Sequence, residues 1–210
     1  MGRLKARRFD TKGYRDFILQ NGSLLVLAAL LLLGMVCGAL LVKGEFLTVL
    51  QLDEMVKGFT SARQSQGFFV TCLASFLGIL PFMALSVFLG LSSVGAPFIV
   101  LLPFVRGLGL GMISGFLYAN MGLSGVAFAA LILTPVNFLS SLAIILSCRQ
   151  SLKLSVSLFG VVRPESPYLD LWPVCREFLY RQGRYAMLLL ASVLLDGILS
   201  TAFMRFFTFQ

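Results

Sequence analysis

The stretch Pro97-Phe-Ile-Val-Leu-Leu-Pro-Phe-Val-Arg-Gly-Leu-Gly-Leu-Gly-Met-Ile-Ser-Gly-Phe-Leu117 contains no charged residue except Arg106. Arg106 is also the single charge in the whole run that separates Arg63 from Arg149. A soluble domain cannot keep such a run, because its surface must face water. The sequence therefore predicts a chain that crosses the membrane several times. An arginine at membrane depth is costly, so we expect it to have a partner, a water-filled cavity or a function.

The composition of the whole chain agrees with a membrane protein. Hydrophobic residues make up 58% and charged residues 12% of the 210 residues, and the mean hydropathy is +0.93. The net charge of +8 comes from basic residues that flank apolar segments, so we expect membrane lipid and no nucleic acid as a partner. Histidine is absent and the cysteines lack metal-binding spacing, so we expect free thiols, no metal and no other cofactor. The cysteines are Cys37, Cys72, Cys148 and Cys175.

Five apolar segments are long enough to cross a hydrocarbon core of about 30 Å as helices. The first could be a signal peptide, but its length and the lack of a small-residue cleavage site favour an uncleaved anchor. An alternative reading starts the third span at Gly107 and leaves Arg106 at the membrane interface. We expect an all-α membrane helix bundle that forms a single integral-membrane domain over residues 1–210. Its spans are expected at about residues 23–42, 68–89, 98–118, 125–147 and 185–204.

Basic residues predict the orientation of the chain. Six of them precede the first span and six lie in the 148–184 loop, whereas the 43–67 loop has three that three acidic residues balance. The positive-inside rule then places the N-terminus and the 148–184 loop in the cytosol, and the 43–67 loop and the C-terminus outside. Within the cytosolic loop, Asp170 is expected to cap a short helix that runs through Arg181 towards the last span.

Apolar residues in the 43–67 loop recur at near-helical spacing, among them Phe46, Leu50 and Phe59. This pattern predicts a helix at the outer membrane surface. Such a helix could dock a partner or simply cover the outer end of the bundle, and the pattern favours neither.

Three strongly polar side chains lie deep inside the spans, namely Arg106, Asn137 and Asp196. At 1.5 Å per residue, all three are about 12–16 Å from the cytosolic ends of their spans, which places them in one layer. Arg106 is expected to pair with Asp196, and Asn137 to bond either one. The layer is either an internal staple that fixes helix register or the lining of a path for an ion or small solute. We favour the staple, because one ion pair and one amide are few groups for a path.

Glycines spaced four residues apart give the first and third spans a flat face. Such faces allow two helices to approach closely, within one chain or between chains. Packing inside the bundle and formation of a homo-oligomer are therefore both open. These helix-packing glycines are Gly34 and Gly38 in the first span, and Gly107, Gly111 and Gly115 in the third.

The sequence contains few residues that could carry out catalysis. The sequence has no carboxylate pair inside a span, and the adjacent Asp53 and Glu54 would point in different directions on a helix. We therefore expect a protein that is not an enzyme. A small permease- or channel-like subunit is the alternative, supported by the polar layer and by three prolines that would kink their helices, Pro81, Pro103 and Pro135.

Several segments together resemble the stage II sporulation protein M (SpoIIM) family. The most specific are the glycine-rich segment Phe104–Leu117 with its basic residue, and Pro135-Val-Asn137 in the fourth span. The length of the chain and its five spans also fit. Asp196 departs from the pattern, in which glutamate is expected, and its shorter side chain reduces the reach of the carboxylate. Further matching segments are Gly34–Val42, Gly90–Pro97 and Leu194–Thr201.

The resemblance implies a non-enzymatic scaffold in the mother-cell and septal membrane of a sporulating cell. Members of this family anchor a complex with two peptidoglycan-degrading partners, SpoIIP and SpoIID. The complex thins the septal wall so that the membrane can migrate during engulfment of the forespore. More distant relatives occur in organisms that do not sporulate, so this role is an expectation rather than a consequence of the fold.

Overall fold

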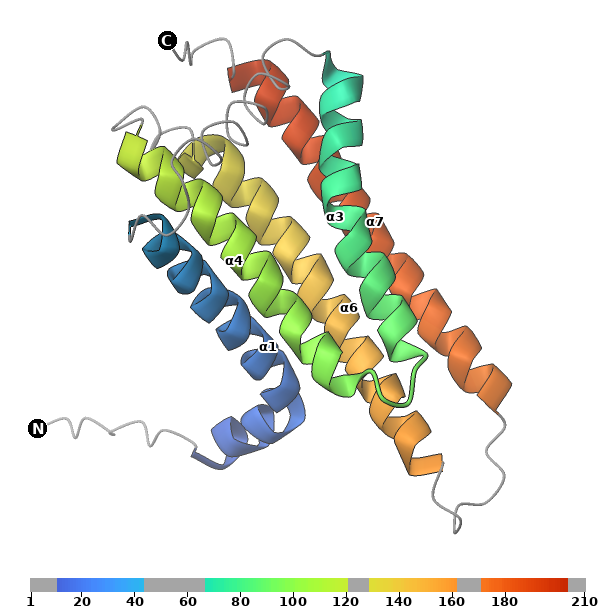
Figure 1. Cartoon of the computed structure of the whole chain (residues 1–210). Helices are drawn as coiled ribbons and strands as arrows, with labels where there is room; N and C mark the ends of the chain where they lie inside the picture. Colours follow the sequence, from blue (N-terminus) through green and yellow to red (C-terminus); the bar gives the residue numbers. More distant parts are fainter. Residues whose placement is uncertain (1–10, 44–66, 121–128, 162–170, 204–210) are drawn as a thin grey trace, which may run out of the picture.

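A computed structural model of the chain describes residues 11–43, 67–120, 129–161 and 171–203 (Figure 1). In this part of the chain, five helices are long and apolar enough to cross a membrane. The prediction of an all-helical bundle with five spans is therefore confirmed. The helices are α1 (Thr11–Lys43), α3 (Phe68–Gly90), α4 (Ala96–Asn120), α6 (Thr134–Val161) and α7 (Leu171–Phe203), and the π-helical segment η1 (Ala129–Leu133) directly precedes α6.

The helices lie side by side in an order that differs from their order in the chain (Figure 1). α1 packs mainly against α4, and α4 also contacts α6 and α3. α7 packs on the other side, against α3 and α6. Apolar side chains from all five helices form the buried core, among them Leu27, Ile79, Leu102, Ile144 and Leu189. Because α3 and α6 lie between α4 and α7, a side chain on α4 meets these two helices before it can reach α7.

The helix α4 is continuous from Ala96 to Asn120, with Arg106 near its middle. At 1.5 Å per residue, Arg106 is about 15 Å from the first residue of the helix. The helix therefore extends well before Gly107, where the alternative reading begins the third span. Pro103 lies inside α4 and Pro81 inside α3 without ending either helix. In hydrocarbon, an interrupted helix would leave backbone groups without partners, which favours a continuous helix around such prolines.

Two helices extend well beyond the membrane-spanning segments that the sequence predicted. α6 continues to Val161, and α7 begins at Leu171, so most of the predicted 148–184 loop is helical. The predicted short helix and the last span are one helix. Charges such as Arg149 mark the edge of an apolar span, but they do not end a helix. Pro173 lies in the first turn of α7, where its missing N–H has no helical partner to lose.

The fourth span begins with η1 rather than with a regular α-helix. Pro135 has no N–H to offer the carbonyl group of the preceding turn, and the wider π-helical turn lies directly before it. The Thr134 hydroxyl group donates a hydrogen bond of 2.9 Å to the Ala129 carbonyl oxygen. This bond joins the Thr134 side chain to the carbonyl group five residues before it, at the start of the π-helical segment.

Candidate functional site

The two predicted glycine faces meet each other where α1 packs on α4. A Cβ atom built on Gly34 or Gly38 would overlap backbone atoms of α4, and one built on Gly107 or Gly111 would overlap backbone atoms of α1. At Gly115 the approach is slightly looser, because a Cβ atom would lie 3.1 Å from the nearest backbone atom of α1. These five glycines therefore pack within one chain, and their faces are not available to a second copy.

Direct backbone contact matters here because lipid removes the usual hydrophobic drive for helices to associate. Close packing must then come from van der Waals contact and weak Cα–H···O contacts, both of which require small residues at the crossing. Glycines of each helix lie beside carbonyl groups of the other. The neighbouring pairs are Gly34 with Phe104, Gly38 with Leu108, Gly107 with Leu31, and Gly111 with Met35.

The carboxylate of Asp196 belongs to the contact between α7 and α3. Asp196 is only 1% exposed. The hydroxyl group of Ser75 on α3 donates to this carboxylate, and that of Ser200, one turn along α7, donates over 3.4 Å. The next residue, Gly197, allows α3 to come close, since a Cβ atom there would lie 2.7 Å from the ring of Phe68.

The side chain of Arg106 lies against α3. Its guanidinium carbon is 5.5 Å from the centre of the Phe82 ring, within the range of a cation–π contact. Its Nε atom is buried and has no hydrogen-bond partner within the described part of the chain. The predicted ion pair with Asp196 is not among the contacts of the described residues. Equal depth was not enough to bring the two together, because α3 and α6 separate their helices.

Asn137 lies at a different helix contact from Arg106 and Asp196. It lines a largely apolar groove of about 650 Å³ among α1, α4 and α6. Its neighbours there include Gly111 and Ser114 of α4. No hydrogen bond within the described residues joins Asn137 to Arg106 or Asp196. The three predicted polar residues therefore lie at three different helix contacts, and they do not form one connected layer.

A line of buried polar residues that was not predicted from the sequence holds α3, α6 and α7 together. The hydroxyl oxygens of Ser86 and Ser147 are 2.6 Å apart, and the Gln182 amide nitrogen donates 3.0 Å to the Ser151 hydroxyl oxygen. Ser155 donates to a carbonyl oxygen in the turn between α3 and α4. The spacing of Ser147, Ser151 and Ser155 at every fourth residue was a usable signal. Gln182 had none, because it was assigned to a loop.

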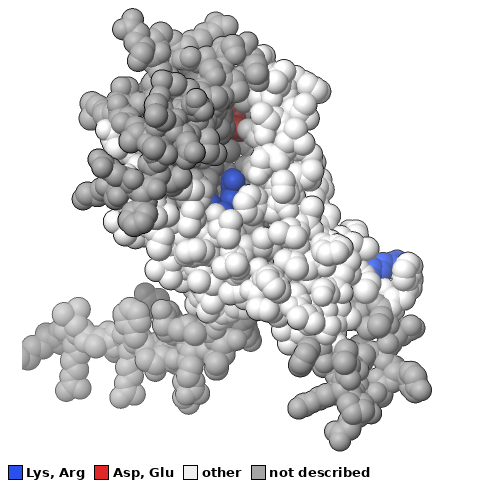
Figure 2. All heavy atoms as spheres, in the orientation of Figure 1, with Lys and Arg blue, Asp and Glu red and all other residues white. Residues whose placement is uncertain are grey.

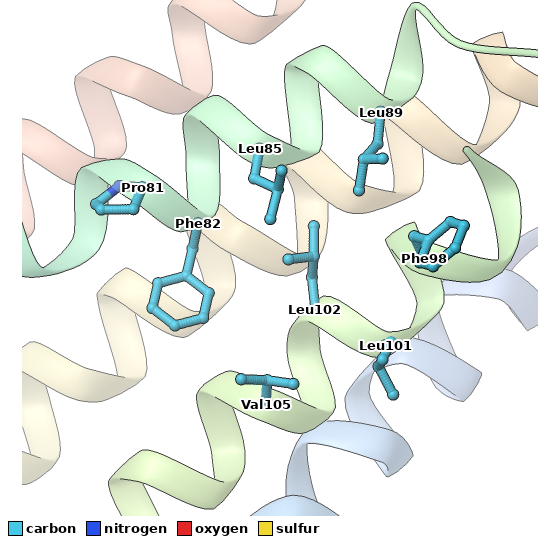
Figure 3. A pocket seen from close by; sticks show the side chains of 8 residues that line it. All are labelled: Pro81, Phe82, Leu85, Leu89, Phe98, Leu101, Leu102 and Val105. Carbon is cyan, nitrogen blue, oxygen red and sulfur yellow. The ribbon is translucent and has the colours of Figure 1, made fainter. Parts of the chain in front are cut away.

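The predicted partner-docking residues Phe46, Leu50 and Phe59 lie outside the described residues. The predicted cap Asp170 also lies outside them. The described helices offer a different surface, a groove between α3 and α4 with a volume of about 400 Å³ and an apolar lining (Figure 3). Arg106 lies just beyond one end of this groove, since Phe82 lines the groove and stacks on the guanidinium group.

Five apolar helices, a glycine contact between two of them and buried serines between the others define a multi-pass membrane protein. The family model described as Stage II sporulation protein M matches residues 27–204, which include the second half of α1 and all the later helices. The chain therefore belongs to the stage II sporulation protein M family, and it is a sporulation-related membrane protein. No curated protein and no solved structure matches it.

Proposed function

We propose that the chain is a non-enzymatic membrane anchor of a peptidoglycan-degrading complex that thins the septal wall during engulfment. Its partners are then SpoIIP-like and SpoIID-like wall-degrading proteins, and its site of action is the mother-cell and septal membrane. The observation that carries this proposal is the family match over residues 27–204. The resemblance found in the sequence supplies the role and the partners.

The interior of the bundle fits a scaffold. Its glycines bring α1 and α4 into backbone contact, and the hydroxyl groups of Ser86, Ser147 and Ser151 bond across helices. Both features hold helices in fixed positions. The permease-like alternative depended on a polar layer of Arg106 with two further residues. Since those side chains lie at different helix contacts, that alternative retains only the support of the prolines inside the helices.

An anchor needs contact surface that faces outward, and the apolar residues of the 43–67 loop are the first place to test. The double variant Phe46→Glu with Phe59→Glu is expected to insert in the membrane at normal levels. It should no longer co-purify the wall hydrolase, and spore-forming cells that carry it as their only copy should stall in engulfment.

The control is Trp172→Glu, which places one glutamate at an aromatic residue that is 76% exposed at the other end of the bundle. This variant is expected to retain the hydrolase and to support engulfment. Normal partner binding and engulfment in the double variant would remove the outer loop from the proposal. Engulfment that is normal in cells lacking the whole protein would reject the anchor function itself.

A further inference from the structure

The groove between α3 and α4 is a long apolar surface that faces away from the centre of the bundle. Side chains from both helices line it, among them Leu85 of α3 and Leu101 of α4, which are 47% and 52% exposed (Figure 3). Phe82 and Val105 mark one end of the groove and Leu89 and Phe98 the other. Because α3 and α4 both cross the apolar layer, this surface meets hydrocarbon or another membrane-embedded molecule.

A cation stands at the Phe82 end of this groove. Arg106 is one helical turn beyond Leu102 on α4, and the face of Phe82 covers its guanidinium group. Arginine stays protonated in proteins and has five N–H donors. Within the described residues, its contacts comprise this ring and no carboxylate, and its Nε donor is buried without an acceptor. Among described atoms on the face shown in Figure 2, a basic patch lies near the middle with a small acidic patch close above it, and a second basic patch lies at the lower right.

Two glycines leave open space beside the arginine. Gly78 is one turn from Phe82 on α3, and Gly109 is one turn from Val105 on α4. A Cβ atom on either glycine would meet nothing within 4 Å, in contrast to the glycines that face α1. A helix approaching along the groove would therefore meet two small-residue faces at the level of Arg106, which permits close backbone approach.

The positive charge of Arg106 limits which molecules could occupy the groove between α3 and α4. A lipid acyl chain fits an apolar groove but brings no anion, and Arg106 is about 15 Å from the start of α4, deeper than a lipid headgroup. A second copy would have to offer Asp196, but this carboxylate is 1% exposed and accepts from Ser75. A carboxylate on a foreign helix could bind the guanidinium group through two parallel hydrogen bonds.

We propose that the α3–α4 groove and Arg106 form a docking site for a transmembrane helix of another protein that carries a glutamate or aspartate at mid-membrane. The site deepens the proposed function, on which it rests for the identity of the complex, because an anchor must hold its partners within the membrane as well as outside it.

The test uses the full-length protein in vesicles of neutral phosphatidylcholine, with a fluorescent label at its N-terminus. The probes are synthetic leucine-rich transmembrane peptides with an acceptor dye and either one glutamate or one leucine at the central position. Energy transfer against peptide concentration gives an apparent affinity. The glutamate peptide is expected to bind roughly 5-fold to 30-fold more tightly than the leucine peptide, the range for one polar contact between helices.

Three variants separate the parts of the site. Arg106→Gln should bind both peptides equally, and Gly109→Leu should weaken binding of the glutamate peptide by filling the open space. Gly183→Leu is the matched control, because Gly183 is another open glycine, on α7 and away from the groove, and should bind like the wild type.

Equal binding of the two peptides by the wild type would overturn the proposal, as would a glutamate preference that survives in Arg106→Gln. Loss of the preference when phosphatidylglycerol is added would show that Arg106 binds a lipid anion instead. These results involve no wall hydrolase, so failure here would leave the anchor function standing. Conversely, the protein could bind the glutamate peptide and yet prove dispensable for engulfment. That pair of results would support the docking site and reject the anchor function.

Discussion

Two glycines of α4 that are two residues apart should respond in opposite ways to the same substitution. In Gly111→Ala, the new Cβ atom would lie 2.8 Å from the Met35 carbonyl carbon of α1, whereas Gly109→Ala would meet nothing within 4 Å. Relaxed carbon–carbon contacts are about 3.5–4.0 Å, so α1 and α4 would have to separate by roughly 1 Å.

The size of the difference follows from this separation. A gap of 0.5–1 Å forfeits a quarter to a half of each atom-pair attraction along the seam, and overpacking of tight contacts typically costs about 1–3 kcal/mol. Both variants also gain about 1 kcal/mol in helix propensity, which cancels when they are compared. Gly111→Ala should therefore be less stable than Gly109→Ala by about 1–3 kcal/mol.

The measurement is reversible unfolding in mixed micelles with increasing dodecyl sulfate, monitored by circular dichroism for both variants and the wild type. A further comparison, Gly107→Ala, should behave like Gly111→Ala because its Cβ atom would also overlap the α1 backbone. If Gly109→Ala and Gly111→Ala proved equally stable, the intramolecular glycine contact between α1 and α4 would be refuted.

Three further outcomes are expected. Arg106→Leu and Asp196→Leu should have additive effects on unfolding free energy within about 0.5 kcal/mol, since the two side chains contact different neighbours, and a coupling well above this would restore the ion pair. Gln182→Ala should cost about 1–3 kcal/mol in the same assay because it removes a buried donor and leaves a cavity, and Gln182→Leu should cost less because it fills part of that cavity; a larger loss in Gln182→Leu would show that the site does not accept the branched side chain. Reporter fusions at Gln51 and Gln210 should both show export, and an internal signal at Gln210 would contradict a five-span topology.

The number of spans was predictable because it depends on local quantities. A run such as residues 68–89 predicts a membrane-spanning helix by its length and its lack of charge, whatever surrounds it. The glycine spacing was equally local, and it correctly marked faces that need a close neighbour. Which helix supplies that neighbour is a property of the whole bundle, and the sequence pattern left packing within one chain and between chains equally open.

The polar residues were harder because depth is only one of the coordinates that place a side chain. Arg106 and Asp196 were assigned equal depth, but the direction in which each side chain points and the order of the helices decide whether they meet. The Asp196 carboxylate instead bonds Ser75, a residue 121 positions away, and no local pattern indicates that contact. Ser200 was within reach of sequence reasoning, because it lies one turn from Asp196 on the same helix.

The glycines on the two faces of α4 differ in whether helix packing offsets their cost in stability. Each glycine inside a helix costs about 1 kcal/mol relative to alanine. Gly107 and Gly111 recover this cost through backbone contact with α1, which no larger residue would permit. For Gly109, no contact within the described chain offsets this cost, since its missing side chain leaves open space. The same holds for Gly78 across the groove. A helix of another protein that packed on this face would offset this cost, and it would lie beside Arg106, whose buried Nε has no acceptor within the described residues. Helix packing and charge therefore favour the same face of α4 for a membrane-embedded partner.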